Sequence, residues 1–227
     1  MFRGHQKSSF IDYPKKISTV FFTGGCNFRC PYCHNSSLVN NRGDKLSMEY
    51  AIEYLVKRKK MIDAVCISGG EATLHEGIYD FIIETKKLGY LVKIDTNGTN
   101  PNFIKKLIDE NLLDYIAMDI KAPFKKYNEV TGTTVDIGNI NKTINIIIES
   151  NIDYEFRTTV CKELLDIHDI IDISKEIKEA KRYIIQNFKD GDTILDGKNK
   201  FTSFTKDELE DLKQKISNLF LDFKIRN

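Results

Sequence analysis

Apolar and polar positions along the chain follow two periods, and together they predict strands that alternate with helices. Short runs rich in β-branched and aromatic residues are typical of buried strands. These runs cover residues 17–23, 64–68, 91–96, 115–121, 154–160 and 182–188. Between them, apolar residues recur every three to four positions, as in helices that cover one face of a sheet. This regular alternation indicates a parallel sheet with right-handed crossovers.

The length of the chain predicts a barrel that does not close. A complete eight-unit barrel takes about 250 residues, whereas this chain has 227 and shows about six or seven strand patterns. We therefore expect an α/β fold, a partial (β/α)6 barrel open on one side, in one domain over residues 1–227. A helix at about residues 205–219, which begins with the capping box Thr205-x-x-Glu208, is expected to close this fold. An open doubly wound sheet is the alternative.

Charged side chains gather on one face of three predicted strands. Because successive side chains point to opposite faces, this face carries Lys93, Asp95 and Asn97, then Ala117, Asp119 and Lys121, then Glu155, Arg157 and Thr159. Charges buried without partners would be costly. One interpretation is an internal network of salt bridges or a water-facing edge. The other is a polar cavity for a small charged ligand at the carboxyl ends of the strands.

Composition narrows the classes of partner. The chain has 34 Lys and Arg against 33 Asp and Glu, a net charge of +1, so no overall field would attract nucleic acid or an anionic membrane. No apolar run approaches the roughly 18 residues that span a bilayer, and the first ten residues do not resemble a signal peptide. We expect a cytoplasmic protein that binds neither nucleic acid nor membrane.

Three of the five cysteines fall in one loop, residues 24–36, after the first predicted strand. An odd number of cysteines with this clustering does not indicate a disulfide framework. Residues 30–34 have the C-x-x-C-H form of haem attachment, but that chemistry belongs in an exported protein and leaves Cys26 unused. A zinc site could use the three cysteines and His34, although such sites draw ligands from two separate segments. An iron-sulfur cluster held by three thiolates, with its fourth iron open, is the third interpretation.

Two motifs at matching strand ends resemble the radical S-adenosylmethionine (SAM) superfamily. They are C-x3-C-x2-C with Tyr32 before its last cysteine, and Ser68-Gly69-Gly70-Glu71 after the second strand. The resemblance implies a partial (β/α)6 barrel that binds a 4Fe-4S cluster, with SAM chelating the open iron through its amino and carboxylate groups. The reduced cluster would cleave the sulfonium to a 5′-deoxyadenosyl radical that abstracts hydrogen.

Further segments resemble the anaerobic ribonucleoside-triphosphate reductase activating proteins, which are glycyl-radical activases related to pyruvate formate-lyase activating enzyme. These segments are residues 11–14, 22–35, 95–98, 117–123 and 157–160. Lys15, Ser36 and Ala72 depart from the family pattern. The resemblance implies a glycyl-radical enzyme as protein substrate and a flavodoxin or ferredoxin type electron donor. The alternatives are a radical SAM enzyme acting on a small molecule or peptide, and a non-enzymatic binding module stapled by zinc.

The resemblance also implies roles for residues of the cysteine loop. Cys26, Cys30 and Cys33 would hold the cluster and carry its catalytic chemistry. Tyr32 and His34 would flank the adenine of SAM. For His34, a hydrogen bond to a cluster sulfide or to a loop carbonyl is the alternative.

The remaining cofactor contacts that the resemblance implies lie at the ends of three other strands: Gly69, Gly70, Glu71, Asp95, Asn97, Asp119, Lys121 and Arg157. Gly69 and Gly70 lack a Cβ atom and permit close backbone approach to the ligand, while Glu71 would fix the loop or meet the amino group of SAM. Asp95 and Asp119 match carboxylates that help hold a monovalent cation beside SAM, or else pair with neighbouring lysines. Lys121 and Arg157 would lie near the carboxylate and ribose of SAM. Cys66 and Cys161 are expected to be small core residues.

Overall fold

The computed structural model describes residues 1–226, so Asn227, the last residue of the expected domain, lies outside the described residues. One sheet contains the strands β1 (Phe2–Ser9), β2 (Ser18–Thr23), β3 (Ala64–Gly69), β4 (Leu91–Thr96), β5 (Tyr115–Asp119), β6 (Asp153–Val160), β7 (Arg182–Asn187) and β8 (Asp222–Arg226). The helices are α1 (Ser36–Val39), α2 (Met48–Arg58), α3 (Gly77–Lys87), α4 (Pro101–Asp109), α5 (Tyr127–Thr131), α6 (Ile137–Glu149), α7 (Ile167–Glu176) and α8 (Lys206–Ile216).

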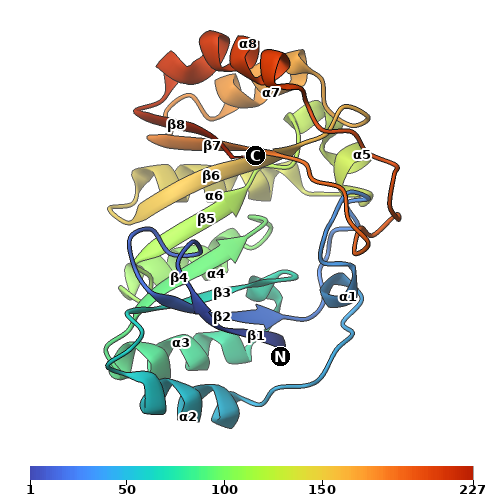
Figure 1. Cartoon of the computed structure of the whole chain (residues 1–227). Coiled ribbons are helices and arrows are strands. Elements are labelled where there is room, and N and C mark those ends of the chain that lie inside the picture. The colour runs from blue at the N-terminus through green and yellow to red at the C-terminus, as the bar shows by residue number, and fades with distance from the viewer. Residues whose placement is uncertain (227) are drawn as a thin grey trace.

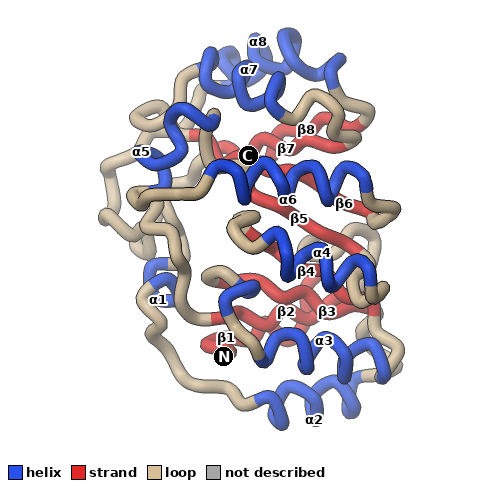
Figure 2. Tube along the Cα trace, turned by 180° about the vertical axis from the view of Figure 1, so that it is seen from behind, coloured by secondary structure: helices blue, strands red, loops and turns tan. Residues whose placement is uncertain are grey.

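The strands follow one another across the sheet in chain order, from β1 to β8. All neighbouring pairs from β2 onward are parallel, and only β1 runs antiparallel to β2. The helices α2, α3, α4, α6, α7 and α8 cover one face of the sheet (Figures 1 and 2). A doubly wound sheet would reverse its strand order and carry helices on both faces. The structure is therefore the expected open barrel, with β1 and β8 at its two edges.

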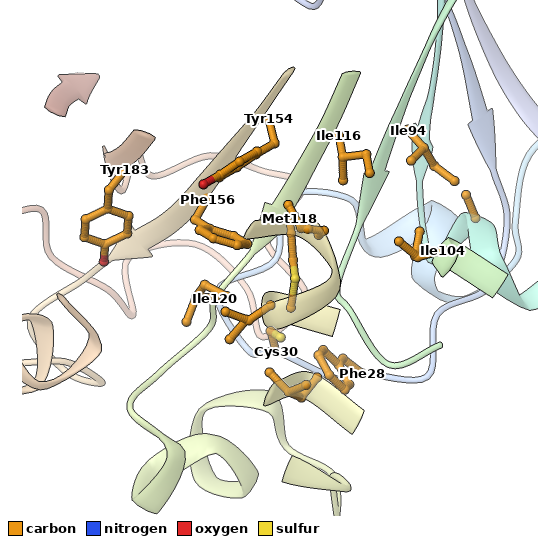
Figure 3. Packing of buried hydrophobic residues seen from close by; sticks show 14 of the residues in the cluster. Phe28, Cys30, Ile94, Ile104, Ile116, Met118, Ile120, Tyr154, Phe156 and Tyr183 are labelled. Atoms are coloured by element: carbon orange, nitrogen blue, oxygen red, sulfur yellow. The ribbon is translucent and has the colours of Figure 1, made fainter. Parts of the chain in front are cut away.

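The structure confirms that side chains along the central strands alternate between an apolar and a polar face, as the sequence predicts. Ile94, Ile116, Met118 and Phe156 are fully buried beneath the helices, and Figure 3 shows them within one packed cluster. Burying each of these side chains stabilises the fold by about 1.5–3 kcal/mol. Their neighbours along the strands turn to the concave inner face, as Lys93 does. The apolar outer face thus holds the sheet against its helices and leaves the inner face free for polar groups.

Local signals predicted several element ends correctly. Ser47 caps α2 by accepting from the N–H of Tyr50, Pro101 opens α4, and the capping box of Thr205 and Glu208 starts α8. Within residues 1–226, no helix has the length and apolar character needed to cross a membrane.

The two edge strands were missed from the sequence. Neither β1 nor β8 contains a continuous buried run, because half-exposed edge strands carry polar and charged side chains on both faces. The C-terminal helix begins at the expected capping box, but α8 ends at Ile216 and the chain continues into β8, which forms the edge of the sheet.

His5 on β1 lies in an aromatic environment that joins this strand to α2. Its ring stacks on Phe21 at 4.2 Å between centroids, and its nitrogens hydrogen-bond the hydroxyls of Tyr50 and Thr19 at 3.0 and 2.8 Å. Burial, and then the charge of Lys7, lower the pKa of His5 from 6.5 to about 4. The neutral imidazole therefore fits this position.

Candidate active site

A cavity opens at the carboxyl ends of the strands, and every residue that the sequence assigned to the site lines it. These residues are Cys26, Cys30, Tyr32, Cys33, His34, Gly69, Gly70, Glu71, Asp95, Asn97, Asp119, Lys121 and Arg157. They come from the ends of β2 to β6 and the loops that follow. Since α/β folds place ligands at this end of the sheet, convergence of residues up to 131 positions apart in the chain (157 − 26) makes this cavity the candidate active site.

The cysteine loop is held to the rest of the fold by main-chain hydrogen bonds. The N–H of Gly25 donates to Leu38 O at 2.7 Å, and the N–H of Arg29 donates to Thr131 O at 2.8 Å. Near its end, Cys33 O accepts from the N–H of Leu195 at 2.9 Å. Contacts from three separate parts of the chain therefore fix the loop that carries the three thiols.

Two of the three thiols, those of Cys26 and Cys30, lie in a weakly hydrated environment. Cys30 is 6% exposed, and burial raises its pKa to about 12; burial also raises the pKa of Cys26. Because thiolates are the form that binds metal, loading this loop must release protons.

The donor set fits a cluster better than a single metal ion. Within residues 1–226, no three Cys, His, Asp or Glu side chains are grouped so that they could hold one metal ion. Nε2 of His34 hydrogen-bonds Lys189 O, which is the loop-carbonyl alternative considered for it. In a 4Fe-4S cluster, each thiolate binds a different iron, so the three sulfurs need not converge on one metal ion. The geometry disfavours the closed zinc site.

The hydroxyl of Tyr32 gives an independent sign that the site suits a polar molecule. Its side chain is 4% exposed and lines the cavity, yet its hydroxyl has no hydrogen-bond partner among the described residues. Buried polar groups nearly always have a partner. Burial also raises the pKa of Tyr32 well above its usual value, so the hydroxyl keeps its proton and can donate it in a hydrogen bond. The residues present therefore fit a bound polar molecule next to the cysteines.

The two glycines serve the packing of one loop on another. Gly69 has a φ of 114°, in the region that favours glycine, and a Cβ at Gly70 would overlap the carbonyl oxygen of Gly25. Gly70 N–H donates to Thr23 O at 2.9 Å. The close approach that the structure shows at these positions is to the backbone at the end of β2 and in the loop after it. The expected close approach to the ligand stays a prediction.

Glu71 ties the end of β3 to the end of β4. Its Oε1 accepts from the N–H and hydroxyl of Thr73 at 3.1 and 2.6 Å and from the hydroxyl of Thr96 at 2.8 Å. Its Oε2 accepts from the N–H of Asn97 at 2.6 Å. Glu71 is 1% exposed. Burial raises the pKa of its carboxyl group, although the four hydrogen bonds act to lower it. Of the two roles considered for Glu71, this geometry supports fixing the loop.

Asn97, held by Glu71, connects the loop after β4 to the cysteine loop. Its side-chain amide donates to Asn27 Oδ1 at 2.8 Å and lies 4.0 Å from Cys26 Sγ. Its own oxygen accepts from the N–H of Thr99. Asn97 therefore orients the first cysteine of the motif through two contacts on its loop.

Three carboxylates and three cations form a buried network along the inner face: Asp95, Asp119 and Glu155 with Lys93, Lys121 and Arg157. Asp119 accepts from Arg157 at 2.8 Å and from Lys121 at 3.0 Å, and Lys93 and Arg157 pair with Asp95. Burial alone would raise the pKa of Asp119, but the charges of Arg157 and then Lys121 hold it well below its usual range. The structure contains both the salt-bridge network and a polar cavity, because the network lies along one wall of the cavity. The small charged ligand stays a prediction.

Six further residues line the cavity without having been assigned to it: Phe28, Asn35, Val39, Ser68, Thr96 and Thr159. Thr159 follows from face alternation, since it shares the polar face of Arg157. Ser68 donates to Asp95 at 2.9 Å across neighbouring strands, a contact that strand order would suggest. The local pattern gives no signal for Phe28, which lies in the cysteine loop, or for Val39, which ends α1 directly after that loop.

Comparison with known proteins gives concordant matches. The family model described as the radical SAM superfamily matches residues 20–177. A Methanocaldococcus jannaschii protein, whose name assigns it to the glycyl-radical enzyme activating enzymes, is 38% identical over 94% of this chain and 90% of its own length. The pyruvate formate-lyase-activating enzyme of Clostridium pasteurianum is 34% identical over 51% of this chain and 50% of its own length.

A solved structure shows the same fold. Streptococcus suis SuiB bound to S-adenosylmethionine matches with a TM-score of 0.73 over 92% of this chain and 49% of that chain. The two sequences are 17% identical, so this likeness concerns the fold alone.

Proposed function

The chain belongs to the radical SAM superfamily, and from that membership we propose that it is an activase that abstracts a hydrogen atom from a glycine of a partner enzyme. The family implies a 4Fe-4S cluster and SAM as cofactors. The observation that carries the proposal is the cavity in which three thiols meet the unpartnered phenol of Tyr32 and the network of Asp119. We also propose that residues 1–227 act as one domain.

We assign the cluster to Cys26, Cys30 and Cys33. When bound, the cluster supplies an electron that cleaves SAM and yields the hydrogen-abstracting radical. The protein residues have simpler tasks. The hydroxyl of Tyr32 donates a hydrogen bond to the bound cofactor, with His34 at the edge of the same cavity. The cationic groups of Lys121 and Arg157 offset the negative charge of a ligand carboxylate.

The partner we propose is a glycyl-radical enzyme, with anaerobic ribonucleoside-triphosphate reductase as the first candidate. Support for the class comes from the similarity to proteins named as glycyl-radical enzyme activating enzymes. Support for the reductase comes from the segments at residues 11–14, 22–35 and 117–123, which resemble its activating proteins. A flavodoxin or ferredoxin type protein would donate the electron.

The monovalent cation beside Asp95 and Asp119 stays a prediction. Lys93, Lys121 and Arg157 already neutralise these two carboxylates. A bound Na⁺ or K⁺ would therefore have to share them. A dependence of SAM cleavage on the identity of the added cation, at constant ionic strength, would support the site.

Anaerobic reconstitution tests the proposal in two stages. Iron and sulfide analysis and formation of 5′-deoxyadenosine establish the cofactor chemistry. Incubation with SAM, reductant and the candidate reductase, followed by electron paramagnetic resonance, should then show a glycyl doublet. Colourless protein that holds zinc but no iron would contradict the first stage.

A second candidate function stays open after the first stage. If 5′-deoxyadenosine forms but no glycyl-radical enzyme acquires the doublet, the substrate is a small molecule or a peptide. Isotope transfer from a deuterated substrate into 5′-deoxyadenosine would then identify the hydrogen donor.

A further inference from the structure

The outer edge of β8 borders a groove that the cofactor chemistry does not use. The groove is lined from α8 by Lys206, Leu209, Glu210 and Lys213 and from β8 by Phe223, Lys224, Ile225 and Arg226. Leu209 is buried at its base, with Phe223 and Ile225 half-buried beside it. Figure 1 shows β8 at the end of the sheet next to α8.

The main chain along this edge is open. Asp222 N–H donates to Lys181 O at 3.0 Å, so Asp222 directs its main-chain groups toward the β7 side. Because these directions alternate along a parallel strand, Phe223 and Ile225 direct theirs outward. Within residues 1–226, no strand pairs with that outer side. An open edge with alternate side-chain pockets is the arrangement that accepts an extended peptide as an added strand.

The charge of the groove indicates which peptide fits. Its lining carries four cations and one carboxylate. Lys213 pairs with Glu210 at 3.6 Å and Lys224 with Asp222 at 3.1 Å, but Arg182 shares that aspartate at 2.7 Å. Such exposed pairs are weak. Arg226 pairs with the buried carboxylate of Glu155 at 3.1 Å, but Arg157 also lies 3.9 Å from that carboxylate. Because Asp222 and Glu155 are each shared by two cations, the rim stays positive. A second copy of this chain would bring the same cations against it, whereas an acidic segment would be attracted.

The groove leads to the candidate active site. Arg226 lies at the end of the groove nearest the carboxyl ends of the strands, and it also lines a neighbouring hollow together with His34 and Thr159. Those two residues in turn line the cavity of the three cysteines. A chain lying along β8 in the direction of the cavity would therefore pass over this hollow and reach the cavity mouth.

We propose that an extended acidic segment of the glycyl-radical partner adds to β8 as a further strand, with alternate apolar side chains in the groove beside Leu209. This inference rests on the proposed function, because it takes the partner to be the activated enzyme. Docking at β8 would raise the local concentration of the partner at the cavity mouth without contacting the cofactors.

Two pairs of matched variants test the docking surface. Lys213→Glu reverses a charge in the groove, and Lys215→Glu reverses one on the same helix outside it; each lysine pairs with a neighbouring carboxylate and they are 53% and 47% exposed. Ile225→Pro removes an outward N–H, while Ile225→Ala removes the same side chain and keeps that N–H. Circular dichroism and thermal melting establish that each variant is folded.

The binding measurement uses each glycyl-radical enzyme encoded in the source genome, purified and immobilised, with the reconstituted chain as analyte at two salt concentrations. We expect Kd to rise at least tenfold for Lys213→Glu, relative to Lys215→Glu, and for Ile225→Pro, relative to Ile225→Ala. Hydrogen exchange should show protection of residues 222–226 in the complex. Formation of 5′-deoxyadenosine without partner should be unchanged in all four variants.

The outcomes separate this inference from the proposed function. If no partner binds, if Kd is the same within each pair, or if protection reflects self-association in sedimentation, the β8 docking site is wrong. A glycyl doublet that forms equally with all variants would leave the activase function standing and refute the docking site. Binding that follows the expected pattern without any doublet would support the docking site and refute the function.

Discussion

Replacement of Glu71 tests how the loops around the cavity are held. In Glu71→Ala, the main-chain N–H groups of Thr73 and Asn97 lose their acceptor, whereas the hydroxyls can turn elsewhere. Each buried N–H left unpaired costs about 1–3 kcal/mol, so the two together cost roughly 2–6 kcal/mol. Burial raises the pKa of this carboxyl, so alanine also removes the cost of burying a charge. We therefore expect a loss of about 2–4 kcal/mol in the free energy of unfolding.

Glu71→Gln separates the hydrogen bonds from the charge. The amide oxygen can replace Oε1 and serve its donors, but the NH₂ group then faces the N–H of Asn97. One unpaired donor predicts a smaller loss, about 1–2 kcal/mol.

The assay is urea unfolding of the iron-free chain with reduced thiols at pH 7, followed by far-ultraviolet circular dichroism. Glu76→Ala is the matched control, because this exposed glutamate lies near the same loop and its side chain makes no capping hydrogen bond. The control should stay within about 0.5 kcal/mol of the unmodified chain. If Glu71→Ala and Glu71→Gln also stay within that limit, Glu71 does not hold the loops together and the reasoning is refuted.

Three further predictions concern single positions. Cys30→Ala should lose most of the iron and sulfide after reconstitution, whereas Cys66→Ala, which removes a buried thiol outside the cavity, should retain them; equal metal content would exclude Cys30 as a ligand. Gly70→Ala should destabilise the chain by about 1–3 kcal/mol through overlap with backbone, while Gly191→Ala, with open space around it, should change stability by less than about 1 kcal/mol. Because the pKa of His5 falls from 6.5 to about 4 on folding, its contribution is present above pH 6.5 and is lost as pH decreases toward 4. The full shift corresponds to roughly 3 kcal/mol, and solvent screening of the half-exposed ring reduces it to about 1–2 kcal/mol. Urea unfolding across this range should show a smaller pH slope for His5→Gln, and an unchanged slope would contradict the assignment.

The central strands could be predicted because their buried positions form runs of apolar residues in the sequence. Ile116 and Met118 alternate with Ala117 and Asp119, and burial under the helices requires that alternation. The two edge strands could not be predicted because each is half-exposed. The residues around His5 on β1 and Lys224 on β8 are as polar as those of a surface loop, so their pattern does not indicate a strand.

The site could be predicted as a set of residues but not as a set of contacts. The spacing of the cysteines and the strand-end positions of Asp119 and Arg157 indicated one cavity. Glu71 holds Asn97, which lies 26 residues further along the chain (97 − 71). This contact follows from the placement of β3 beside β4 in the sheet. Among residues 1–226, the buried hydroxyl of Tyr32 has no hydrogen-bond partner. This too depends on which groups surround it, and no local pattern specifies them.

The strands lie in the sheet in the same order as in the chain, and this has a consequence for synthesis on the ribosome. Each strand that emerges finds its hydrogen-bonding neighbour already made, so the sheet can grow by one unit at a time in the direction of translation. The segment with the three thiols is translated early, yet the wall that faces it is finished only once β6 has emerged. Metal that reached the nascent chain before β6 emerged would therefore meet the three sulfurs without the facing wall, so the enclosure of the cofactor site is complete only once β6 has joined the sheet.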